Sequence, residues 1–357
     1  MKNAKEKLKK DSGIQVYFVP QLPVNRFLIL SYLNIYYCFF CVFFLTVLNN
    51  FNIIHCHGLN AVRPSIIIKK FLKKIKIVFN VHGATPEERI YSNPSTPKKW
   101  LTKLEKDETF SLKYSDGVIF VSDALKNHYI NKYNIFIDHS VIIPCLFENI
   151  INLNYESISQ NRKKLNLKSK IVFIYVGSYR KYQLPYETLK FFSDLNSVFD
   201  NAFLIILTSH IIQFSEILDE LKISKDRYFV KQVKHSEISE YISLADFGFL
   251  LRENNIVNNV ASPTKFGEYL SCGVPLIMSD HIGDYSEFTY SNNLGIVLNN
   301  NVFDNKLINE IKLIVEKRMD YFKRSVEFAK LNLTWNENFQ EQLKEFCLGL
   351  FNEKKDN

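Results

Sequence analysis

The stretch Ser262–Ile277, SPTKFGEYLSCGVPLI, organises the rest of the chain. Ser262 is a good helix N-cap and Pro263 suits the first helical position, so a short helix is predicted to follow them. Gly273 is predicted to end that helix in the left-handed conformation, and Val274–Met278 is an apolar run typical of a buried strand. Loop, helix and buried strand in this order indicate an α/β fold.

The first turn of this helix carries residues suited to a nucleotide. A helix N-terminus presents unpaired N–H groups and partial positive charge, and Lys265 adds a full charge. Glu268 lies at i+3 from Lys265 and i+4 from Thr264, so the three share one face. A carboxylate one turn below a phosphate site can accept hydrogen bonds from sugar hydroxyls. The stretch predicts a nucleoside-diphosphate site, and the alternative is a capped helix with solvated charges.

Strands and helices alternate in two series, separated by a polar segment at 149–170. This pattern predicts parallel sheets in two domains. We expect a first domain at 1–150, a second at 168–332, and a C-terminal helix at 333–351 that returns to the first. The periodicity also predicts a basic helix over residues 1–10, a strand over Ile14–Val19, and one long helix over 304–330.

The first part of the chain is basic. The protein has 45 Lys+Arg and 37 Asp+Glu, and residues 1–145 hold 20 and 10 of these. No nucleic-acid motif accompanies this charge, so an anionic membrane surface is the expected partner and nucleic acid is not. The 22 residues Phe27–Leu48 carry no charge. They predict a buried or surface-docked helix, with a membrane span as the alternative.

Histidines and acids follow two strands of the first domain. His57 and Gly58 end one strand, His82 and Gly83 end the next, and Glu87 and Glu88 follow in a predicted loop. Open α/β sheets keep their sites at such carboxyl edges. A metal shared by His55 and His57 is not expected because no third ligand is near. The six Cys, with a single CxxC spacing and no second pair, predict free thiols in a reducing compartment.

The chain resembles the group 1, family-4-like glycosyltransferases with GT-B architecture, the retaining type that builds bacterial surface polysaccharides and lipopolysaccharides. The resemblance rests on motifs along nearly the whole chain: His55–Gly58, Asn80–Gly83 with Pro86–Glu88, Ser115–Ser122, Val141–Pro144, Tyr175–Ser178, Leu251-Arg252, Ser262–Pro275 and Leu333–Trp335. The resemblance implies two Rossmann-like domains facing a central cleft, with the first domain lacking its N-terminal strand.

The resemblance also implies roles for individual residues. A UDP- or GDP-sugar donor would be bound by Gly177, Ser178, Arg180, Lys181, Ser262, Thr264, Lys265 and Glu268. His82, Arg252 and Lys265 would be catalytic, and the acceptor side would hold His57, Gly58, Gly83, Glu87 and Glu88. Fixed cations and helix amides stabilise a departing nucleoside diphosphate, so neither a metal nor a cofactor is implied.

One departure from the family pattern is Val260, which stands where the family often has an acid eight residues before Glu268. Contacts to the donor sugar are then expected from Asn258, Asn259 or the backbone.

The resemblance implies transfer of a hexose or related sugar to a growing, lipid-linked surface glycan such as lipopolysaccharide or capsule. The enzyme would be peripheral on the cytoplasmic face of the plasma membrane. The alternatives are a non-catalytic GT-B partner subunit and a nucleotide-sugar epimerase or phosphorylase on the same fold.

Overall fold

The computed structural model describes residues 28–147 and 155–352. The basic helix expected at 1–10 and the strand expected at Ile14–Val19 lie outside the described residues. By their internal contacts, two compact units are distinguished. Unit 1 is Met1–Asn80 with Glu105–Val118, and unit 2 is Val81–Leu104 with Ile119–Asn357.

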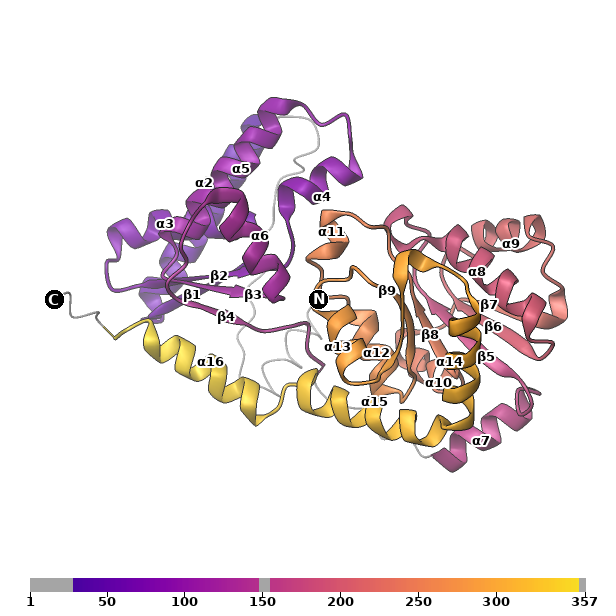
Figure 1. The fold of residues 1–357 in the computed structure, drawn as a ribbon. Helices are drawn as coiled ribbons and strands as arrows, with labels where there is room; N and C mark the ends of the chain where they lie inside the picture. The colour runs from indigo at the N-terminus through magenta and orange to yellow at the C-terminus, as the bar shows by residue number, and fades with distance from the viewer. Residues whose placement is uncertain (1–27, 148–154, 353–357) are drawn as a thin grey trace. The chain divides into compact units, whose positions relative to one another are not determined.

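The first sheet has four strands in the order β1-β2-β3-β4 (Figure 1). β1 pairs in parallel with β2, and His57 lies opposite Asn80 at the carboxyl end of the pair. The strands are β1 (Ile53–His57), β2 (Lys76–Val81), β3 (Gly117–Phe120) and β4 (Ser140–Ile142). The helices of this part of the chain are α2 (Leu28–Leu48), α3 (Leu59–Phe71), α4 (Thr85–Ser92), α5 (Lys98–Tyr114) and α6 (Asp123–Tyr133).

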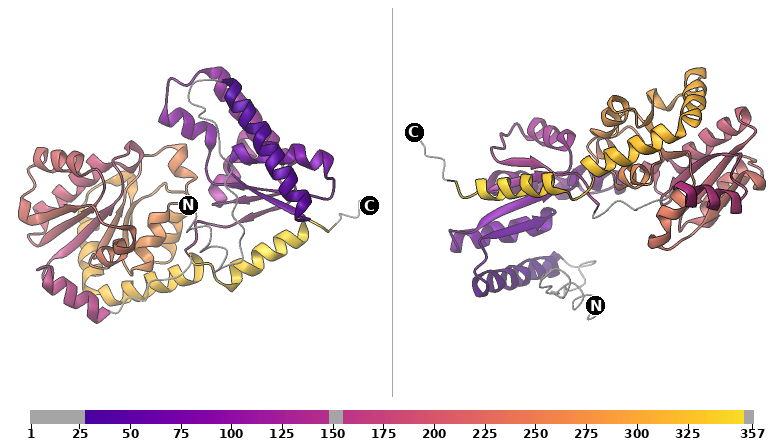
Figure 2. Two further views of the ribbon diagram at one scale, coloured as in Figure 1. Left: turned by 180° about the vertical axis from the view of Figure 1, so that it is seen from behind. Right: turned by 90° about the horizontal axis from the view of Figure 1, so that it is seen from below.

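The uncharged stretch forms α2, a single long helix that Figure 2 shows in indigo. It packs against α3, where the rings of Phe39 and Phe43 meet Phe71 with centroids 6.2 and 6.4 Å apart. Among the described residues, no helix combines the length and the apolar character needed to cross a membrane.

The second sheet lies wholly in unit 2 and has six strands in the order β10-β9-β8-β5-β6-β7 (Figure 1). Every neighbouring pair is parallel. The strands are β5 (Ile171–Val176), β6 (Ala202–Leu207), β7 (Tyr228–Lys231), β8 (Phe247–Leu250), β9 (Leu276–Ser279) and β10 (Gly295–Leu298). Together with the first sheet this confirms the predicted α/β class.

Helices cover both faces of this sheet, so its central strands are buried on both sides. Successive residues of β5 alternate between two cores: Phe173 and Tyr175 pack with α8, α9 and α14, whereas Val172 and Ile174 pack with α10, α12 and α15. The helices of this part of the chain are α7 (Tyr155–Lys164), α8 (Pro185–Val198), α9 (Ile211–Glu220), α10 (Ile238–Ile242), α11 (Ile256–Asn259), α12 (Thr264–Ser271), α13 (Tyr285–Ser291), α14 (Asn305–Glu316), α15 (Arg318–Asn332) and α16 (Glu337–Gly349).

Two elements differ from those predicted. The acidic segment after Gly83 is not a loop, because Thr85 and Pro86 start α4, where proline at the first turn removes no helical hydrogen bond. The single helix expected over 304–330 is broken at Lys317, whose φ of −96° and ψ of 25° are not helical. Its N–H closes α14 onto Leu313, and its carbonyl accepts from Asp320 in α15.

Candidate functional site

A pocket of about 230 Å³ opens at the carboxyl edge of the six-stranded sheet. Its walls come from the segments that follow β5, β6 and β7 and from the first turn of α12. The lining residues are Val176, Gly177, Ser178, Leu207, Thr208, Ser209, Gln232, Val233, Ile238 and Lys265. This is the edge at which open α/β sheets bind ligands. Of the predicted donor residues, the structure therefore brings Gly177, Ser178 and Lys265 together.

Tyr269 fixes α12 against this edge. Its side chain is fully buried, and its hydroxyl accepts a hydrogen bond from the backbone N–H of Val176 at 3.0 Å. The ring covers Gly248 of β8 so closely that a Cβ there would lie 2.7 Å from the ring. Because Lys265 is one turn earlier on the same helix, this anchor sets how far the Lys265 amine reaches into the pocket.

Lys265 and Glu268 form an ion pair, with 2.6 Å between Nζ and Oε2. Both side chains are about four-fifths buried, at 22% and 19% exposure. The pair orients the two charged groups on the face that the spacing predicts, and Thr264 precedes them on the exposed first position of α12. A phosphate at Lys265 would compete with Glu268 for the amine, which leaves Glu268 available to hydroxyl donors.

The expected N-cap is displaced by one residue. Pro263, not Ser262, holds the N-cap position, and α12 starts without a side-chain cap. The Ser262 hydroxyl is hydrogen-bonded instead to that of Tyr285. Ser262 therefore holds the loop before α12 in place, and the first N–H groups of the helix are left without a capping side chain.

The turn after β5 is fixed by two polar side chains that the sequence did not suggest. Gln183 Oε1 accepts from the Ser178 N–H at 3.1 Å, and the Tyr175 hydroxyl donates to the Ser178 carbonyl at 3.1 Å. A Cβ at Gly177 would lie 2.6 Å from Gln183 Oε1, so a larger residue would push this side chain away from the turn. Glycine therefore lets Gln183 approach the turn closely.

Arg180 and Lys181 do not line the pocket. Both are exposed, and Lys181 Nζ lies 3.9 Å from a carboxylate oxygen of Glu253. They extend from the same turn toward solvent. Arg180 and Lys181 are thus close to Gly177 in the sequence, but neither side chain is held in a defined position facing the pocket.

Arg252 follows β8 and is buried, with 8% of its surface exposed. Its guanidinium lies over the Tyr182 ring at 5.5 Å, and its backbone N–H is held by the Ser279 hydroxyl. Burial lowers the pKa of Arg252, while the neighbouring Tyr175 and Tyr182 oppose that shift. Within the described ranges, no carboxylate pairs with this guanidinium. A buried cation of this kind is suited to an anionic ligand.

Val260 is buried at 3% exposure and ends α11. Asn258 is equally buried, and its amide donates to the backbone carbonyls of Glu253, at 2.8 Å, and Tyr182. Asn258 is thus a structural residue that holds the loop after β8. Asn259 hydrogen-bonds to Asn254.

In unit 1, His57 is the last residue of β1 and stacks on His55 with ring centroids 4.6 Å apart. Gly58 follows with φ of 76°, a left-handed conformation that favours glycine, and precedes α3. No group of three potential metal ligands was found among the residues that the structure describes.

In unit 2, His82 is exposed directly after β2, and the Gly83 carbonyl accepts from the Tyr129 hydroxyl at 3.0 Å.

The Glu87 carboxylate pairs with Lys132 of α6 at 2.7 Å, and His128 of the same helix lies 3.3 Å away. Burial opposes ionisation of Glu87, but His128 and Lys132 outweigh it and lower the pKa of Glu87 to about 2. Glu88 lies against Gly83, because a Cβ built on Gly83 would lie only 1.9 Å from Oε1 of Glu88. Glu87 is therefore held by α6 as an ion.

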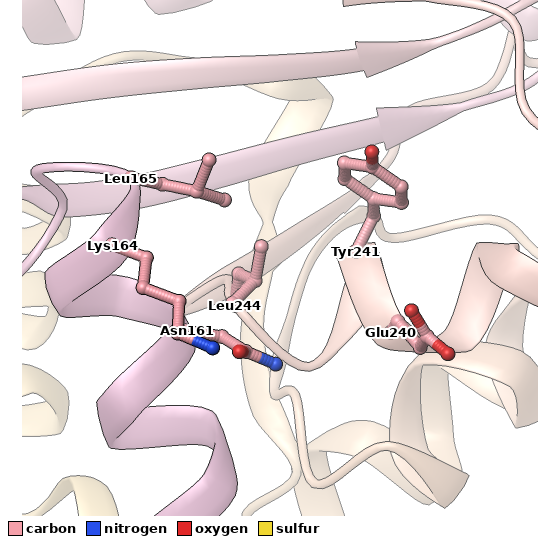
Figure 3. Close-up of a pocket in the computed structure, with 6 residues that line it drawn as sticks. All are labelled: Asn161, Lys164, Leu165, Glu240, Tyr241 and Leu244. Carbon is pink, nitrogen blue, oxygen red and sulfur yellow. The ribbon is translucent and has the colours of Figure 1, made fainter.

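A second pocket, of about 220 Å³, is shown in Figure 3. It lies beside the end of α7 and the segment before β8, and its lining residues are Asn161, Lys164, Leu165, Glu240, Tyr241 and Leu244. These segments precede strands, so this pocket is at the amino edge of the sheet. Its Lys and Glu balance in charge, and it contains none of the predicted site residues.

Comparison with known proteins gives the class. The family model "Glycosyltransferase Family 4" matches residues 6–147, and the model "Glycosyl transferases group 1" matches residues 157–331. A search of curated protein sequences gave no match. The chain is thus a glycosyltransferase of the GT-B architecture. It belongs to the group 1 glycosyltransferases with a family-4-like first part.

Several solved structures share the fold. HepE from Anabaena, in complex with UDP, has a TM-score of 0.71 at 14% identity, over 95% of this chain and 89% of that one. A glycosyltransferase from Rickettsia africae has a TM-score of 0.72 at 15% identity, over 98% and 88%. WaaG, a glycosyltransferase involved in lipopolysaccharide biosynthesis, has a TM-score of 0.56 at 13% identity, over 82% and 83%.

Proposed function

We propose that this glycosyltransferase transfers a hexose or related sugar from a UDP- or GDP-linked donor to a growing, lipid-linked glycan of a bacterial surface, with retention at the anomeric carbon. The observation that carries the donor site is the carboxyl-edge pocket, where Lys265 enters beside the Gly177 turn while Arg252 is buried near Tyr175. UDP is the preferred nucleotide of this proposal, because HepE has been solved with UDP and with UDP-glucose.

In this proposal Lys265 and Arg252 bind the diphosphate. As the glycosidic bond breaks, negative charge grows on the departing nucleotide, and preorganised cations and helix amides stabilise it. Glu268, relieved of Lys265 by the phosphate, accepts hydrogen bonds from the ribose. Gly177, Ser178 and Thr264 supply close backbone approach, and no cofactor takes part.

The acceptor side of the proposal comprises His82 and Gly83 with His57, Gly58, Glu87 and Glu88. His82 is exposed at the end of β2, where it is accessible to a sugar. Glu87 is ionised and held by Lys132, so its role would be to keep this segment in place. A lipid-linked acceptor would place the enzyme at the inner face of the plasma membrane.

Calorimetric titration with UDP, GDP and ADP tests the donor site. We expect one nucleotide to bind, and Lys265→Ala to weaken it roughly 10- to 100-fold, the usual cost of a lost charged hydrogen bond. Glu268→Ala should weaken binding of the nucleotide by about tenfold. Lys312→Ala and Glu316→Ala, a pair of exposed residues at i and i+4 on α14, are the matched controls and should leave binding unchanged.

A folded wild-type chain that binds none of the three nucleotides would overturn the donor site and favour a non-catalytic partner subunit. If a nucleotide binds, NMR of the transferred sugar decides the stereochemistry. An inverted anomeric centre would contradict the proposed retention without touching the donor site.

A further inference from the structure

One face of α2 exposes a stripe of large apolar side chains. They recur every three or four residues, so they share one side of the helix. The stripe comprises Tyr36, Tyr37, Phe40, Phe44, Val47 and Leu48, each between 45% and 77% exposed. Soluble monomeric proteins seldom leave such a contiguous apolar surface in water, and where they do it commonly marks a docking site.

The stripe is not the packing face of the helix. Phe39 and Phe43 point to α3, where they meet Phe71. Phe71 is itself 68% exposed, so the apolar surface continues from α2 onto the end of α3. Because α2 already has a packed side, the stripe is additional surface that the described residues of unit 1 leave exposed.

Lysines flank this surface. Lys70, Lys73 and Lys74 surround Phe71 and are exposed, and no carboxylate pairs with them among the described residues. By contrast, Lys69 and Lys76 are paired with Asp116. Residues 12–86 contain seven Lys or Arg and no Asp or Glu, so nothing in this segment neutralises the cluster or repels an anion.

We propose that this surface, defined as the α2 stripe with Phe71 and Lys70, Lys73 and Lys74, docks the enzyme on an anionic lipid bilayer. Aromatic side chains are favoured at the level of the headgroups, and lysines beside them attract anionic lipids. This inference rests on one part of the proposed function, the lipid-linked acceptor, because such an acceptor is located in a membrane. A protein partner would need a carboxylate-rich apolar groove to match the same surface, whereas an anionic bilayer offers both features at once.

Flotation of the full chain with vesicles tests the inference. Vesicles of phosphatidylcholine with phosphatidylglycerol should bind the protein, phosphatidylcholine alone should not, and salt should weaken binding. Lys70→Gln, Lys73→Gln and Lys74→Gln together should lower partitioning on the order of 100-fold, since each lysine near the surface is worth roughly fivefold. Phe40→Ser with Phe44→Ser should lower it roughly tenfold through lost apolar burial.

Matched controls use exposed residues elsewhere. Phe136→Ser changes an aromatic side chain that is 87% exposed in unit 2, and Lys222→Gln, Lys225→Gln and Lys234→Gln remove three exposed lysines. Neither control should change flotation. The inference is overturned if the controls act as strongly as the test variants, if neutral vesicles bind equally well, or if no vesicles bind.

Two further measurements separate the outcomes. Sedimentation of the wild type and of Phe40→Ser shows whether the stripe instead joins two copies of the chain; a dimer lost in the variant, without flotation, would overturn membrane docking. UDP titration of every variant should be unchanged, because none of these residues lines the donor pocket. If the protein binds UDP but does not bind vesicles, the membrane-docking inference is overturned and the proposed donor site is unaffected. If the wild type binds vesicles but not UDP, the donor site is overturned and the docking inference is unaffected.

Discussion

Tyr269 shows how one residue determines the geometry of the carboxyl-edge pocket that we propose as the donor site. Its hydroxyl is the acceptor for the Val176 N–H, and its ring occupies the space above Gly248. Tyr269→Phe keeps the ring and leaves a buried N–H without its partner, which costs about 1–3 kcal/mol. Urea unfolding of unit 2 should show this loss, and the affinity for UDP should fall as α12 shifts.

The control for this change is Tyr290→Phe on α13, a tyrosine that is 76% exposed. Its free energy of unfolding should stay within about 0.5 kcal/mol of the wild type, as is usual for surface substitutions. Equal losses in the two variants would mean that the Tyr269 hydroxyl has no special role in anchoring α12.

At the scale of single residues, the sequence predicted the shared face of Lys265 and Glu268 because helical spacing fixes it. It predicted Ser262 as the N-cap wrongly, because the partner that draws its hydroxyl away, Tyr285, is distant in the sequence. Gln183 and Tyr175 were missed although their partner Ser178 is only five and three residues away, because no apolar or helical period marks a side chain that hydrogen-bonds to a turn. A glycine directly after an apolar strand was the one local sign that something packs closely on that turn.

Among the elements, α4 is held to α6 through a buried charge. Glu87 faces Lys132 and His128 of α6, with Glu88 beside it on its own helix. Its pKa is about 2 in the folded state against 4.5 in the unfolded chain. The folded state therefore binds fewer protons between these values, and stability from this group is complete above pH 4.5 and lost as the pH falls toward 2.

We expect Glu87→Gln to destabilise the protein by on the order of 2–3 kcal/mol at pH 6 and by much less near pH 2. Chemical unfolding of wild type and variant across this range measures the difference. Glu316→Gln, on the exposed side of α14, should show no such dependence. A difference that stays constant with pH would contradict the ionised state of Glu87.

The elements themselves were largely predictable, since strands buried on both faces are continuous apolar runs and the helices between them are periodic. The interruption at Lys317 was not, because the periodicity of apolar residues continues across it. Helix α4 was missed because polar composition after His82-Gly83 favours a loop, and only its start at Thr85-Pro86 indicates a helix.

At the scale of the whole molecule, all predicted donor residues that the structure brings together in the pocket lie in unit 2. A ligand stabilises only the part that binds it, by about 2.7 kcal/mol at 100 times its Kd. Two buried thiols report on the units separately: Cys56 in unit 1 and Cys272 in unit 2, where burial raises the pKa values to about 11 and about 12.

We therefore expect UDP to raise the temperature at which Cys272 becomes open to alkylation at pH 8 by about 5–10 °C, and to leave that of Cys56 nearly unchanged. Thermal alkylation followed by mass spectrometry measures both sites in one sample. Lys265→Ala should abolish most of the shift. Equal shifts at both thiols would show that the two units unfold together or that UDP binds elsewhere.

The sequence by itself determined the α/β class, the alternation of elements and the family, because these depend on patterns of neighbouring residues. It also determined the charge pair on α12 and the uncharged length of α2. Only the tertiary structure decided which residues meet: Tyr269 with Val176, Glu87 with Lys132, and Arg252 buried without a carboxylate in the described part of the chain. Such contacts join segments far apart in the chain, and their energies depend on burial that no local pattern records.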